Sequence, residues 1–449
     1  MSNNTTQSLE TLFTVHTFSI PQYQRAYSWE VKPHLETFLA DLRQQTVARQ
    51  ANPDKTYYLG SLLLHQTKGN HVDIVDGQQR LTTCVIFVAA ALSAIRNAPA
   101  ILNGTQMTAN ELSHTFIRDM VADKQKLITI LEDNPYFRHI VLSLDSAVVT
   151  TEAPSALRLK KAFNFFKDNV PPNEWPGLLE SLISANVMVY SVSSQSDATL
   201  IFELQNDRGK KLTDLESLKS YLMHLVYLHA TNPDDTLQTI QTHFSTIYRN
   251  VEKQDSQRLA PKEDAILSYH CVAFLKWSSD EWRYPKALIK QNIKSLSRDK
   301  ITPWVVDFVA TLSETYKTVT HLLEDRTLDS FAPLSELIML GRMATFWPLL
   351  IKTYCSDAAG KKKFLLACRL MEVYSLRGGI SKLRSDAGMT SAYIWAREFK
   401  TDFESLYANL FALASSYDLP ARYASGLNRP SLYNMSKSYA RYILWRYEN

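Results

Sequence analysis

The stretch DIVDGQQRLTT, residues 73–83, decides how this chain should fold, because it joins a strand-like segment to a helix-like one. Before it, "YYLGSLLLHQ" and "HVDIVD" are apolar and partly β-branched, and "TKGN" between them supplies residues that a hairpin turn uses. We therefore expect a two-stranded hairpin over residues 57–76. After it, apolar residues recur at three- and four-residue steps in an alanine-rich run, which predicts a long buried helix: Leu81, Val85, Val88, Leu92 and Ile95. The polar cluster should thus lie in a strand-to-helix turn.

The segment "IPQYQRAYSWE", residues 20–30, should enter the fold as a short strand followed by a loop. Pro21 forbids a regular helix at this point, so the polar residues that follow it are expected in the loop: Tyr23, Gln24 and Arg25. A helix should begin near Trp29. It would place four apolar residues on one face: Leu35, Phe38, Leu39 and Leu42.

A second alternation of strand and helix is expected near the middle of the chain. "VMVYSV" predicts a strand, "SDATLIFELQ" a helix and "NDRGKK" a polar loop, and Thr213 with Glu216 form a capping box that opens the next helix. From about residue 230 the pattern is helical and aromatic. We therefore expect a helix-rich α+β chain with two domains, an α/β domain over residues 1–225 and a largely α-helical one over residues 226–449.

The bulk composition favours a globular intracellular protein over other classes. The 449 residues include only 12 glycines, and a formal charge of +4 is too small to imply a polyanion partner by itself. No stretch reaches the roughly 18 uninterrupted apolar residues of a membrane span, and the N-terminus has no signal-peptide pattern. The four cysteines form no CxxC pair and lie in apolar segments, so we expect buried free thiols and a reducing cytoplasm: Cys84, Cys271, Cys355 and Cys368.

The strand-to-helix turn has the residues of a nucleotide site. A helix N-terminus offers unpaired N–H groups to phosphate, Gly77 allows close approach of the backbone, and Arg80 adds a forked donor. Asp76 could hold Mg²⁺ or orient Arg80, while Gln78 or Gln79 could position a water for attack on a terminal phosphate. The structural alternative is that Asp76 caps the helix, Gly77 makes the turn, and the glutamines and arginine are solvated.

Other segments carry weaker signals. "NDRGKK" and "PQYQR" suit a turn or a core as well as a binding loop. Near the C-terminus, Lys437 and Arg441 stand one helical turn apart among aromatic residues, which fits nucleic-acid contact or simply the packing of Tyr442, Leu444 and Trp445. The sequence contains no GxxxxGK[ST] loop, no HExxH motif and no self-sufficient nuclease motif.

Three stretches in this order, "IPQYQRAYSWE", "VDIVDGQQRLTT" and "FELQNDRGKKLTDLESLKSYL", closely resemble the S domain of the GmrSD family of modification-dependent (type IV) restriction proteins. "PSALRLKKAFNFF" is similar to the family's mid-domain helix, and "ARYILWRYEN" is similar to the helix that closes the domain. The resemblance covers nearly the whole chain. It implies a ParB/sulfiredoxin-like core, that is, a small mixed sheet with helices, packed on a largely α-helical second half.

The same resemblance implies a domain that binds and hydrolyses a nucleoside triphosphate with Mg²⁺ in bacterial defence against modified phage DNA. By matching positions, the nucleotide and catalytic motif comprises Asp76, Gly77, Gln78, Gln79 and Arg80, followed by Thr82 and Thr83. Supporting residues expected to face the same cleft are Tyr23, Gln24 and Arg25 of one loop, and Asn206, Arg208 and Gly209 of the other. We further expect a cytoplasmic homo-oligomer that contacts DNA.

The chain departs from many family members, in which an HNH nuclease domain follows the closing helix. That nuclease is then a separate polypeptide or lies outside this sequence, or this member acts without one. The leading hypothesis is an NTPase subunit whose hydrolysis gates DNA binding or a nuclease. One alternative is a ParB-like nuclease that nicks DNA. The other is a non-catalytic module that binds modified DNA or a phage protein. The preferred nucleotide base and the DNA modification stay open.

Overall fold

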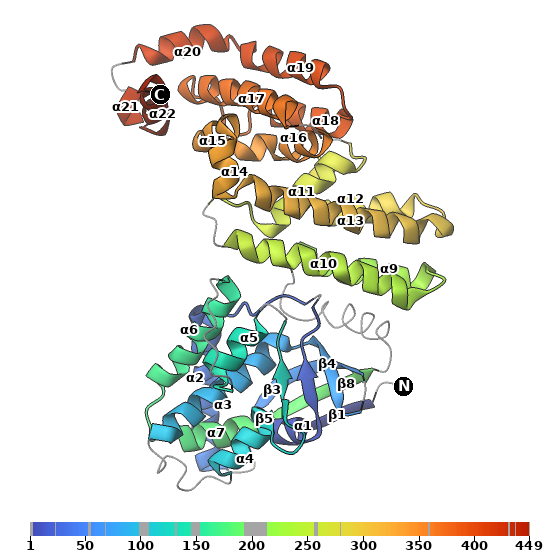
Figure 1. Cartoon of the computed structure of the whole chain (residues 1–449), viewed down its shortest axis with the longest axis vertical. Coiled ribbons are helices and arrows are strands. Elements are labelled where there is room, and N and C mark those ends of the chain that lie inside the picture. Colours follow the sequence, from blue (N-terminus) through green and yellow to red (C-terminus); the bar gives the residue numbers. More distant parts are fainter. Residues whose placement is uncertain are drawn as a thin grey trace. The chain divides into compact units, whose positions relative to one another are not determined.

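The computed structural model describes residues 3–22, 24–52, 55–67, 69–97, 107–130, 133–144, 153–192, 213–255, 259–278, 280–357, 360–429, 432–435 and 437–448. The chain forms two compact units, of which the first comprises residues 1–256 and 301–309 and the second residues 257–300 and 310–449 (Figure 1). Each unit is a set of residues that contact one another more than they contact the rest of the chain. This division does not test the expected domain boundary between residues 225 and 226, which stays a prediction.

The first unit contains a mixed six-stranded sheet in the order β1-β8-β3-β4-β2-β7. Strand β3 pairs with β4 in antiparallel fashion, which confirms the predicted hairpin, while β2 is parallel to both β4 and β7. Strands β5 and β6 form a separate pair. The strands are β1 (Asn3–Ser8), β2 (Thr17–Ser19), β3 (Tyr58–Gln66), β4 (His71–Asp76), β5 (Arg118–Asp119), β6 (Lys124–Gln125), β7 (Leu127–Ile128) and β8 (Asn186–Val192).

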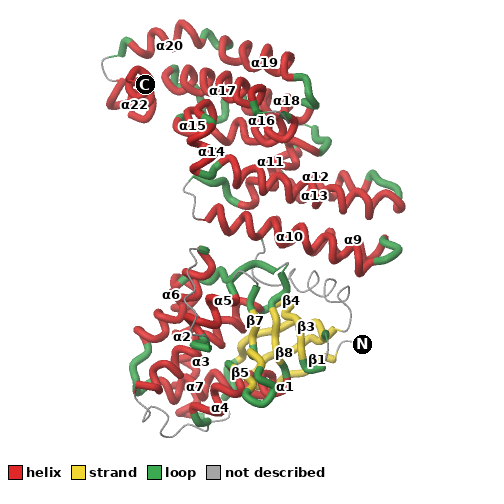
Figure 2. Tube along the Cα trace, in the orientation of Figure 1, coloured by secondary structure: helices red, strands yellow, loops and turns green. Residues whose placement is uncertain are grey.

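Helix α3 lies at the centre of the first unit, where it packs against α4, α6 and α7. Figure 2 shows the strands gathered as one sheet, with α2, α3, α6 and α7 on one side of it. The helical elements of this unit are α1 (Leu9–Val15), η1 (Val31–Leu35), α2 (Glu36–Ala51), α3 (Gln78–Asn97), α4 (Ala109–Phe116), α5 (Asn134–Tyr136), η3 (Phe137–Val141), α6 (Pro154–Asn169), α7 (Trp175–Ile183), α9 (Asp214–His229) and α10 (Pro233–Asp255).

The apolar pattern of the sequence explains why this core forms. Val72 and Ile74 of β4 point into the same cluster as the buried face of α3, whereas Val75 faces the other side of the sheet, in a small cluster with Leu63 and Val192. The four apolar residues predicted to share one face of a helix are all buried: Leu35, Phe38, Leu39 and Leu42. One face of the sheet therefore carries most of the core.

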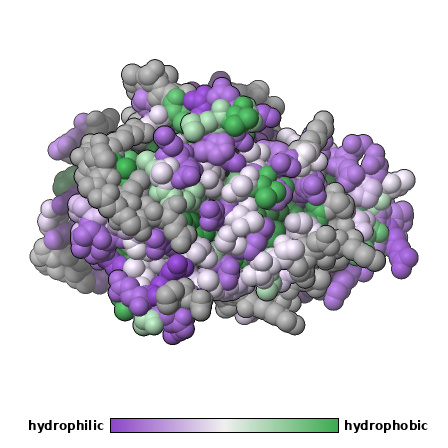
Figure 3. Space-filling view, turned by 90° about the horizontal axis from the view of Figure 1, so that it is seen from below, coloured by the Kyte–Doolittle hydropathy of each residue, from purple (hydrophilic) through white to green (hydrophobic). Residues whose placement is uncertain are grey.

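Among the described residues, one helix is long and apolar enough to cross a membrane, over Gln78–Ile95. About two thirds of that window, 67%, is buried inside the protein, which is the behaviour of a core helix and is consistent with a soluble protein. In Figure 3 the described residues on the visible face are mainly hydrophilic, and apolar residues form small separate groups.

The second unit is built from helices, and both ends of α13 belong to it. Lys352 shows how its helices are joined, because its Nζ donates to the carbonyls of Ala273 and Arg397, at the ends of two other helices. The elements are α11 (Glu263–Phe274), η4 (Glu281–Arg283), α12 (Pro285–Lys294), α13 (Arg298–Leu322), α14 (Asp325–Ser330), α15 (Ala332–Met339), α16 (Met343–Ser356), α17 (Lys362–Ile380), α18 (Met389–Glu398), α19 (Phe403–Ser415), α20 (Leu419–Leu427), α21 (Leu432–Met435) and α22 (Lys437–Glu448).

The closing helix α22 is anchored by polar contacts. The Tyr442 hydroxyl donates to Glu372 Oε1 at 2.8 Å, and Arg446 pairs with the buried Glu336. Leu444 and Trp445 are 57% and 38% exposed. Of the three residues considered as packing residues, Tyr442 is therefore buried, and the other two lie on or near the surface.

The four cysteines are free, and three of them are buried as predicted, namely Cys84, Cys271 and Cys368. The prediction was wrong for Cys355, which is exposed. It lies in the last turn of α16, where its thiol is 3.5 Å from the Thr318 hydroxyl. Cys355 comes one turn after the buried Ile351 and one residue before the end of α16, so its exposure follows from its place at the helix end and not from the apolar pattern around it.

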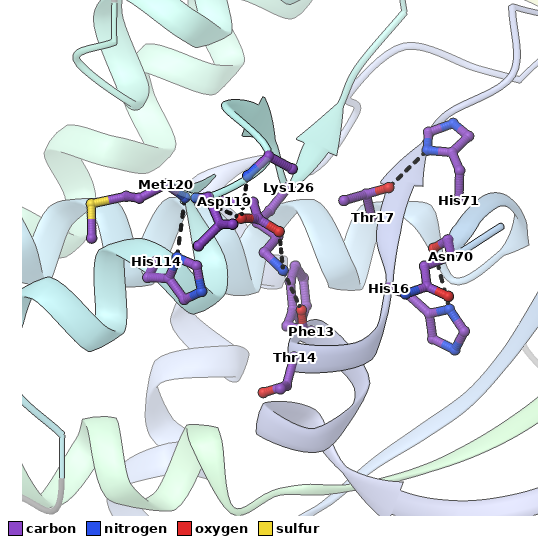
Figure 4. Close-up of polar contacts among 12 residues, drawn as sticks. Phe13, Thr14, His16, Thr17, Asn70, His71, His114, Asp119, Met120 and Lys126 are labelled. Atoms are coloured by element: carbon purple, nitrogen blue, oxygen red, sulfur yellow. Dashed lines mark hydrogen bonds and ion pairs between the residues drawn. The ribbon is translucent and has the colours of Figure 1, made fainter.

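Polar side chains at the start of β2 and β4 serve the fold. Thr17 bonds to His71 Nδ1 at 3.0 Å, and His16 contacts the Asn70 carbonyl, so the first residues of both strands are fastened together (Figure 4). The buried Lys126 donates from Nζ to the Phe13 carbonyl in the last turn of α1. Burial lowers the pKa of the Lys126 amino group, and the nearby carboxylate of Asp119 opposes this shift.

Candidate functional site

Three loops meet at the carboxyl ends of the parallel strands β2, β4 and β7. They follow β2 at Ile20, β4 at Gly77 and β7 at Thr129. Loops that follow parallel strands share one edge of the sheet, which is where ligands bind in many sheets of this kind. A small cavity here is lined by residues of the loops after β2 and β7 and of helix α3. The edge thus brings together "IPQYQRAYSWE" and "VDIVDGQQRLTT", which the sequence singled out, and the segment after β7, which it did not.

The predicted strand-to-helix turn is present. Strand β4 ends at Asp76, Gly77 follows with φ +90°, and α3 begins at Gln78. A Cβ on Gly77 would lie 2.3 Å from Leu62 Cδ2, so a larger residue would need both a strained backbone and a shift of the core. The first N–H groups of α3 are therefore presented at the edge of the sheet, in the manner of an anion-binding turn.

Arg80 is fixed by the neighbouring strand. Its Nη1 donates to the carbonyls of Leu59 at 3.0 Å and Ser61 at 3.1 Å. Between these residues, Gly60 has φ +107° at a bulge in β3, and a Cβ there would lie 2.2 Å from Arg80 Nη1. The bulge therefore makes room for the guanidinium and holds one of its nitrogens. A ligand would meet an arginine whose position is already set.

Gln79 fastens the loop after β2 to α3. Its Oε1 accepts from the Ser28 N–H at 2.9 Å, and its Nε2 donates to the Ala26 carbonyl at 3.0 Å. Both ends of the amide are therefore engaged with backbone, which leaves Gln78 as the better candidate for positioning a water. The Oε1 of Gln78 is buried without a hydrogen-bond partner among the described residues.

Two more contacts complete this fastening. The Tyr27 hydroxyl bonds to Thr83 Oγ1 at 2.8 Å, and Gln24 Nε2 donates to the Val75 carbonyl at 2.8 Å. Arg25 therefore lies between residues that are all tied to β4 or α3. Many polar side chains of residues 24–28 and 78–83 therefore form hydrogen bonds that hold the loop after β2 against β4 and α3.

We predict that Gln79→Ala will loosen this loop. The change leaves the Ala26 carbonyl and the Ser28 N–H without their partner, and unfolding should become easier by about 2 kcal/mol, given ~1–3 kcal/mol for a buried group left unpaired. Hydrogen exchange at Ser28 should accelerate accordingly. Gln78→Ala is the matched control, expected to change stability by less than ~0.5 kcal/mol. Equal exchange at Ser28 in both variants would contradict the prediction.

The first turn of α9 contributes to the same edge. Glu216 Oε1 lies 3.5 Å from Arg25 Nη1, and its Oε2 accepts from the Thr213 N–H in the predicted capping box. Lys219, one turn further, is buried under the ring of Tyr248. The stretch "FELQNDRGKKLTDLESLKSYL" therefore reaches the two stretches described above through its helix, α9.

The charges at this edge act on Asp76. Burial raises the pKa of its carboxyl, and the nearby Glu216 raises it further, while Arg80 and a hydrogen bond from the Gly77 N–H act in the opposite direction. Two acids and two arginines, Asp76 and Glu216 with Arg80 and Arg25, are therefore gathered at the edge. An anion would be attracted by the arginines, and a cation would relieve the repulsion between the acids.

The donors at this edge fit Mg²⁺ with a phosphate ligand. Mg²⁺ prefers oxygen ligands and in nucleotide sites often takes only one or two carboxylates, with substrate phosphates completing its shell. Asp76 and Glu216 supply such carboxylates. No cluster of three or more His, Cys, Asp or Glu residues suited to a metal occurs in the described part of the chain, so the protein alone offers an incomplete set.

Several predicted site residues are placed by the structure and others are not. Asp76, Gly77, Gln78, Gln79, Arg80, Thr82, Thr83, Gln24 and Arg25 lie at or behind this edge. Tyr23, Asn206, Arg208 and Gly209 lie outside the described residues.

Sequence reasoning overlooked three residues near this edge and gave a fourth only a structural role. It missed Gly60, Lys219 and Asp133, and it treated Glu216 only as a helix cap. A glycine inside a strand is a signal for a bulge, which could have revealed Gly60. A lysine in an apolar stretch of a helix could have revealed Lys219. Asp133 gave no signal, because its part in the site depends on how strand β7 pairs.

Comparison with known proteins bears on residues 9–223, which match the family model described as "GmrSD restriction endonuclease, N-terminal domain". The matched segment contains the whole sheet-edge cluster described above, including Arg25, Asp76, Arg80 and Glu216. The search of curated proteins found no match.

Proposed function

Because residues 9–223 form a GmrSD-family N-terminal domain, which indicates a component of a restriction or defence system, we propose that this component binds and hydrolyses a nucleoside triphosphate at the Asp76–Arg80 turn. The observation that carries the proposal is the Gly77 turn, which opens α3 toward the sheet edge with Arg80 already held beside it. This arrangement matches the needs of a phosphate chain, namely backbone N–H donors and a guanidinium in a set position.

The chain's own residues would then divide the work. The N–H groups at the start of α3 would bind phosphate oxygens, and Arg80 and Arg25 would neutralise them. Asp76, with Glu216, would hold Mg²⁺, which when bound would offset the charge of the phosphate oxygens. Gln78, whose amide is not used to fasten the loop, would contact the reacting end of the nucleotide. Gln79 and Thr83 would keep Arg25 in place.

Nucleotide state could be transmitted through α9 and α10. Arg25 pairs with Glu216 of α9, and the Ser155 N–H donates to Glu252 of α10 at 2.7 Å. A phosphate that attracts Arg25 would weaken its pairing with Glu216 and so bias the position of α9. In this proposal, hydrolysis controls the binding of modified phage DNA or the activity of an HNH-type nuclease in a partner protein. The chain would work as a homo-oligomer in the cytoplasm.

The test is phosphate release by the purified chain from ATP, GTP, CTP and UTP with Mg²⁺, with and without modified DNA. We predict turnover that falls at least ~10-fold in Arg80→Ala, because a hydrogen bond to a charged group contributes ~1.5–3 kcal/mol. Arg118→Ala is the matched control, since this half-exposed arginine pairs with Asp123 away from the edge. Thermal unfolding of each variant checks that the fold is kept.

The other outcomes identify the alternatives. Nucleotide that binds without turnover would favour a module that senses DNA or a phage protein, and binding to DNA should then fall steeply with salt. Metal-dependent nicking of DNA that is lost in Asp76→Ala would favour a nuclease. Neither binding nor turnover of any nucleotide would refute the proposal.

A further inference from the structure

Helix α12 and the residues just before it hold an excess of positive charge. Residues 276–300 contain seven lysines and arginines but only three acids, a net charge of +4, which equals the formal charge of the whole chain. The rest of the chain is therefore balanced, and its excess charge is concentrated in this segment. Five of these residues, all in the second unit (Figure 1), define what we call the basic surface: Lys276, Arg283, Lys286, Lys290 and Lys294.

The fold places the lysines of α12 in a row. Lys286, Lys290 and Lys294 follow one another at four-residue steps, so they lie along one side of the helix, about 6 Å apart. Lys294 is exposed, and the other two are half-buried. The large apolar residues of α12 are all buried: Leu288, Ile289 and Ile293. The helix thus packs through an apolar face and presents a row of positive charge beside it.

The loop that precedes α12 is fastened to this helix. Asn292 Nδ2 donates to the Lys276 carbonyl at 3.2 Å, and Gln291 Nε2 donates to Glu281 Oε1 at 3.1 Å. Glu281 also accepts from the N–H and the hydroxyl of Ser278, and these hydrogen bonds lower the pKa of its carboxyl. The exposed Lys276 is therefore kept beside α12, while the carboxylate of Glu281 is engaged within the loop.

Arg283 occupies the other side of the same loop. Its guanidinium lies over the Trp282 ring, 5.1 Å from the centroid, and its Nε is 3.6 Å from Asp280. Trp282 in turn packs edge-on against Tyr393. Over residues 276–278 and 280–294, Tyr284 is the one strongly exposed aromatic residue, at 68%. A single ring does not make the series of stacking platforms that single-stranded nucleic acids use, so this surface offers mainly charge.

We propose that the basic surface binds the phosphate backbone of double-stranded DNA. Charge complementarity supports this occupant, because a DNA duplex has one negative charge for every ~1.7 Å of its axis, and the lysine row can meet several of them. The match of residues 9–223 to a restriction-endonuclease family indicates DNA as the polyanion. A membrane surface does not fit, because α12 buries its large apolar residues and has none to insert into lipid.

This inference goes beyond the proposed function, since binding of the DNA backbone requires no nucleotide hydrolysis. Contacts to phosphates position a protein on DNA without reading its sequence. The basic surface would therefore hold any duplex, modified or not, and recognition of a modification would be the task of other residues.

The test is fluorescence anisotropy of a labelled duplex of about 30 base pairs, titrated with the full chain at several salt concentrations and without nucleotide. In the variant Lys276→Gln with Lys294→Gln, affinity at about 0.1 M salt should fall at least ~10-fold. The slope of log K against log salt concentration should become shallower by about 2, since each lysine contributes about 1. Two duplexes of unrelated sequence should lose affinity equally.

Matched variants separate this surface from general charge. Lys160→Gln with Lys167→Gln makes the same charge change at two exposed lysines of α6 and should alter affinity by less than about threefold. Lys294→Arg keeps the charge and should bind like the wild type, whereas Lys294→Glu should bind more weakly than Lys294→Gln. Thermal unfolding of each variant checks that the fold is kept.

Four results would overturn the inference: no binding of the duplex by the wild type, unchanged binding in the variant of Lys276 and Lys294, an equal loss in the α6 control, or tighter binding of single-stranded DNA or poly-L-glutamate than of the duplex. The last would identify a single strand or an acidic protein as the partner. None of these results concerns phosphate release, so the inference and the proposed function fail separately.

Discussion

Gly60→Ala is expected to weaken nucleotide binding as much as Arg80→Ala, although sequence analysis assigns Gly60 no role in the site. A Cβ at this position would lie 2.2 Å from Arg80 Nη1, so the guanidinium must leave its place. Its two hydrogen bonds to the carbonyls of Leu59 and Ser61 would then be lost. Nucleotide affinity should fall by at least ~10-fold, because a charge-assisted bond is worth ~1.5–3 kcal/mol.

Stability should fall as well. Gly60 has φ +107°, a backbone conformation that costs an alanine ~1–3 kcal/mol. Together with the lost hydrogen bonds, we expect a decrease of about 3 kcal/mol or more in the free energy of unfolding, measured by urea titration.

Gly69→Ala separates the two effects. Gly69 also has a positive φ, +61°, but a Cβ there would meet no atom within 4 Å. This variant should lose only the ~1–2 kcal/mol of backbone strain and should bind nucleotide normally. If Gly60→Ala binds nucleotide like Gly69→Ala, Arg80 does not need its present position to act, and the proposed phosphate site is wrong in this respect.

The sequence predicted the local elements around the site well, because each depends on a short-range pattern. The hairpin of β3 and β4, the buried helix α3 and the capping box of Thr213 and Glu216 follow from periodicity and turn chemistry over a few residues. The residues with stereochemical signals, Gly77 and Pro21, were also interpreted correctly. A pattern of this kind does not depend on where the rest of the chain lies.

The roles of single side chains were harder to predict, because they depend on partners far away in the sequence. Gln79 could have been a catalytic amide, and only the position of residues 26–28 shows that both of its ends bind backbone. Asp133 reaches the edge through the parallel pairing of β7 with β2, and parallel pairing leaves no short-range signal in strands of two and three residues. The site is therefore set by register and topology as much as by its motif.

Lys219→Met is expected to stabilise the protein near pH 7 while lowering its nucleotide turnover. Lys219 is only 8% exposed, and burial lowers the pKa of its amino group to about 7, with Glu216 opposing the shift. An unfolded lysine keeps its proton up to a pKa of ~10.4, so between about pH 7 and that value the unfolded chain holds a proton that the folded chain lacks. The free energy of unfolding should therefore rise with pH across this window.

The sign of this effect makes the variant informative. Burying the charged amine opposes folding fully below about pH 7, and the penalty fades as the pH approaches ~10.4. Each unit of depression corresponds to ~1.4 kcal/mol, so Lys219→Met should gain at least ~2 kcal/mol at pH 7 and little near pH 10.5. Lys161→Met, at an exposed lysine of α6, should show no such pH-dependent difference.

A buried amine that weakens the fold needs a reason to be there, and its place in α9 supplies one. It stands one turn from Glu216, which pairs with Arg25 and acts on Asp76. Its charge would draw the Glu216 carboxylate away from Arg25 when phosphate competes for that arginine. We therefore expect Lys219→Met to lower turnover while raising stability, a combination that is typical of functional sites. A variant that is more stable and equally active would show that Lys219 has no part in the site.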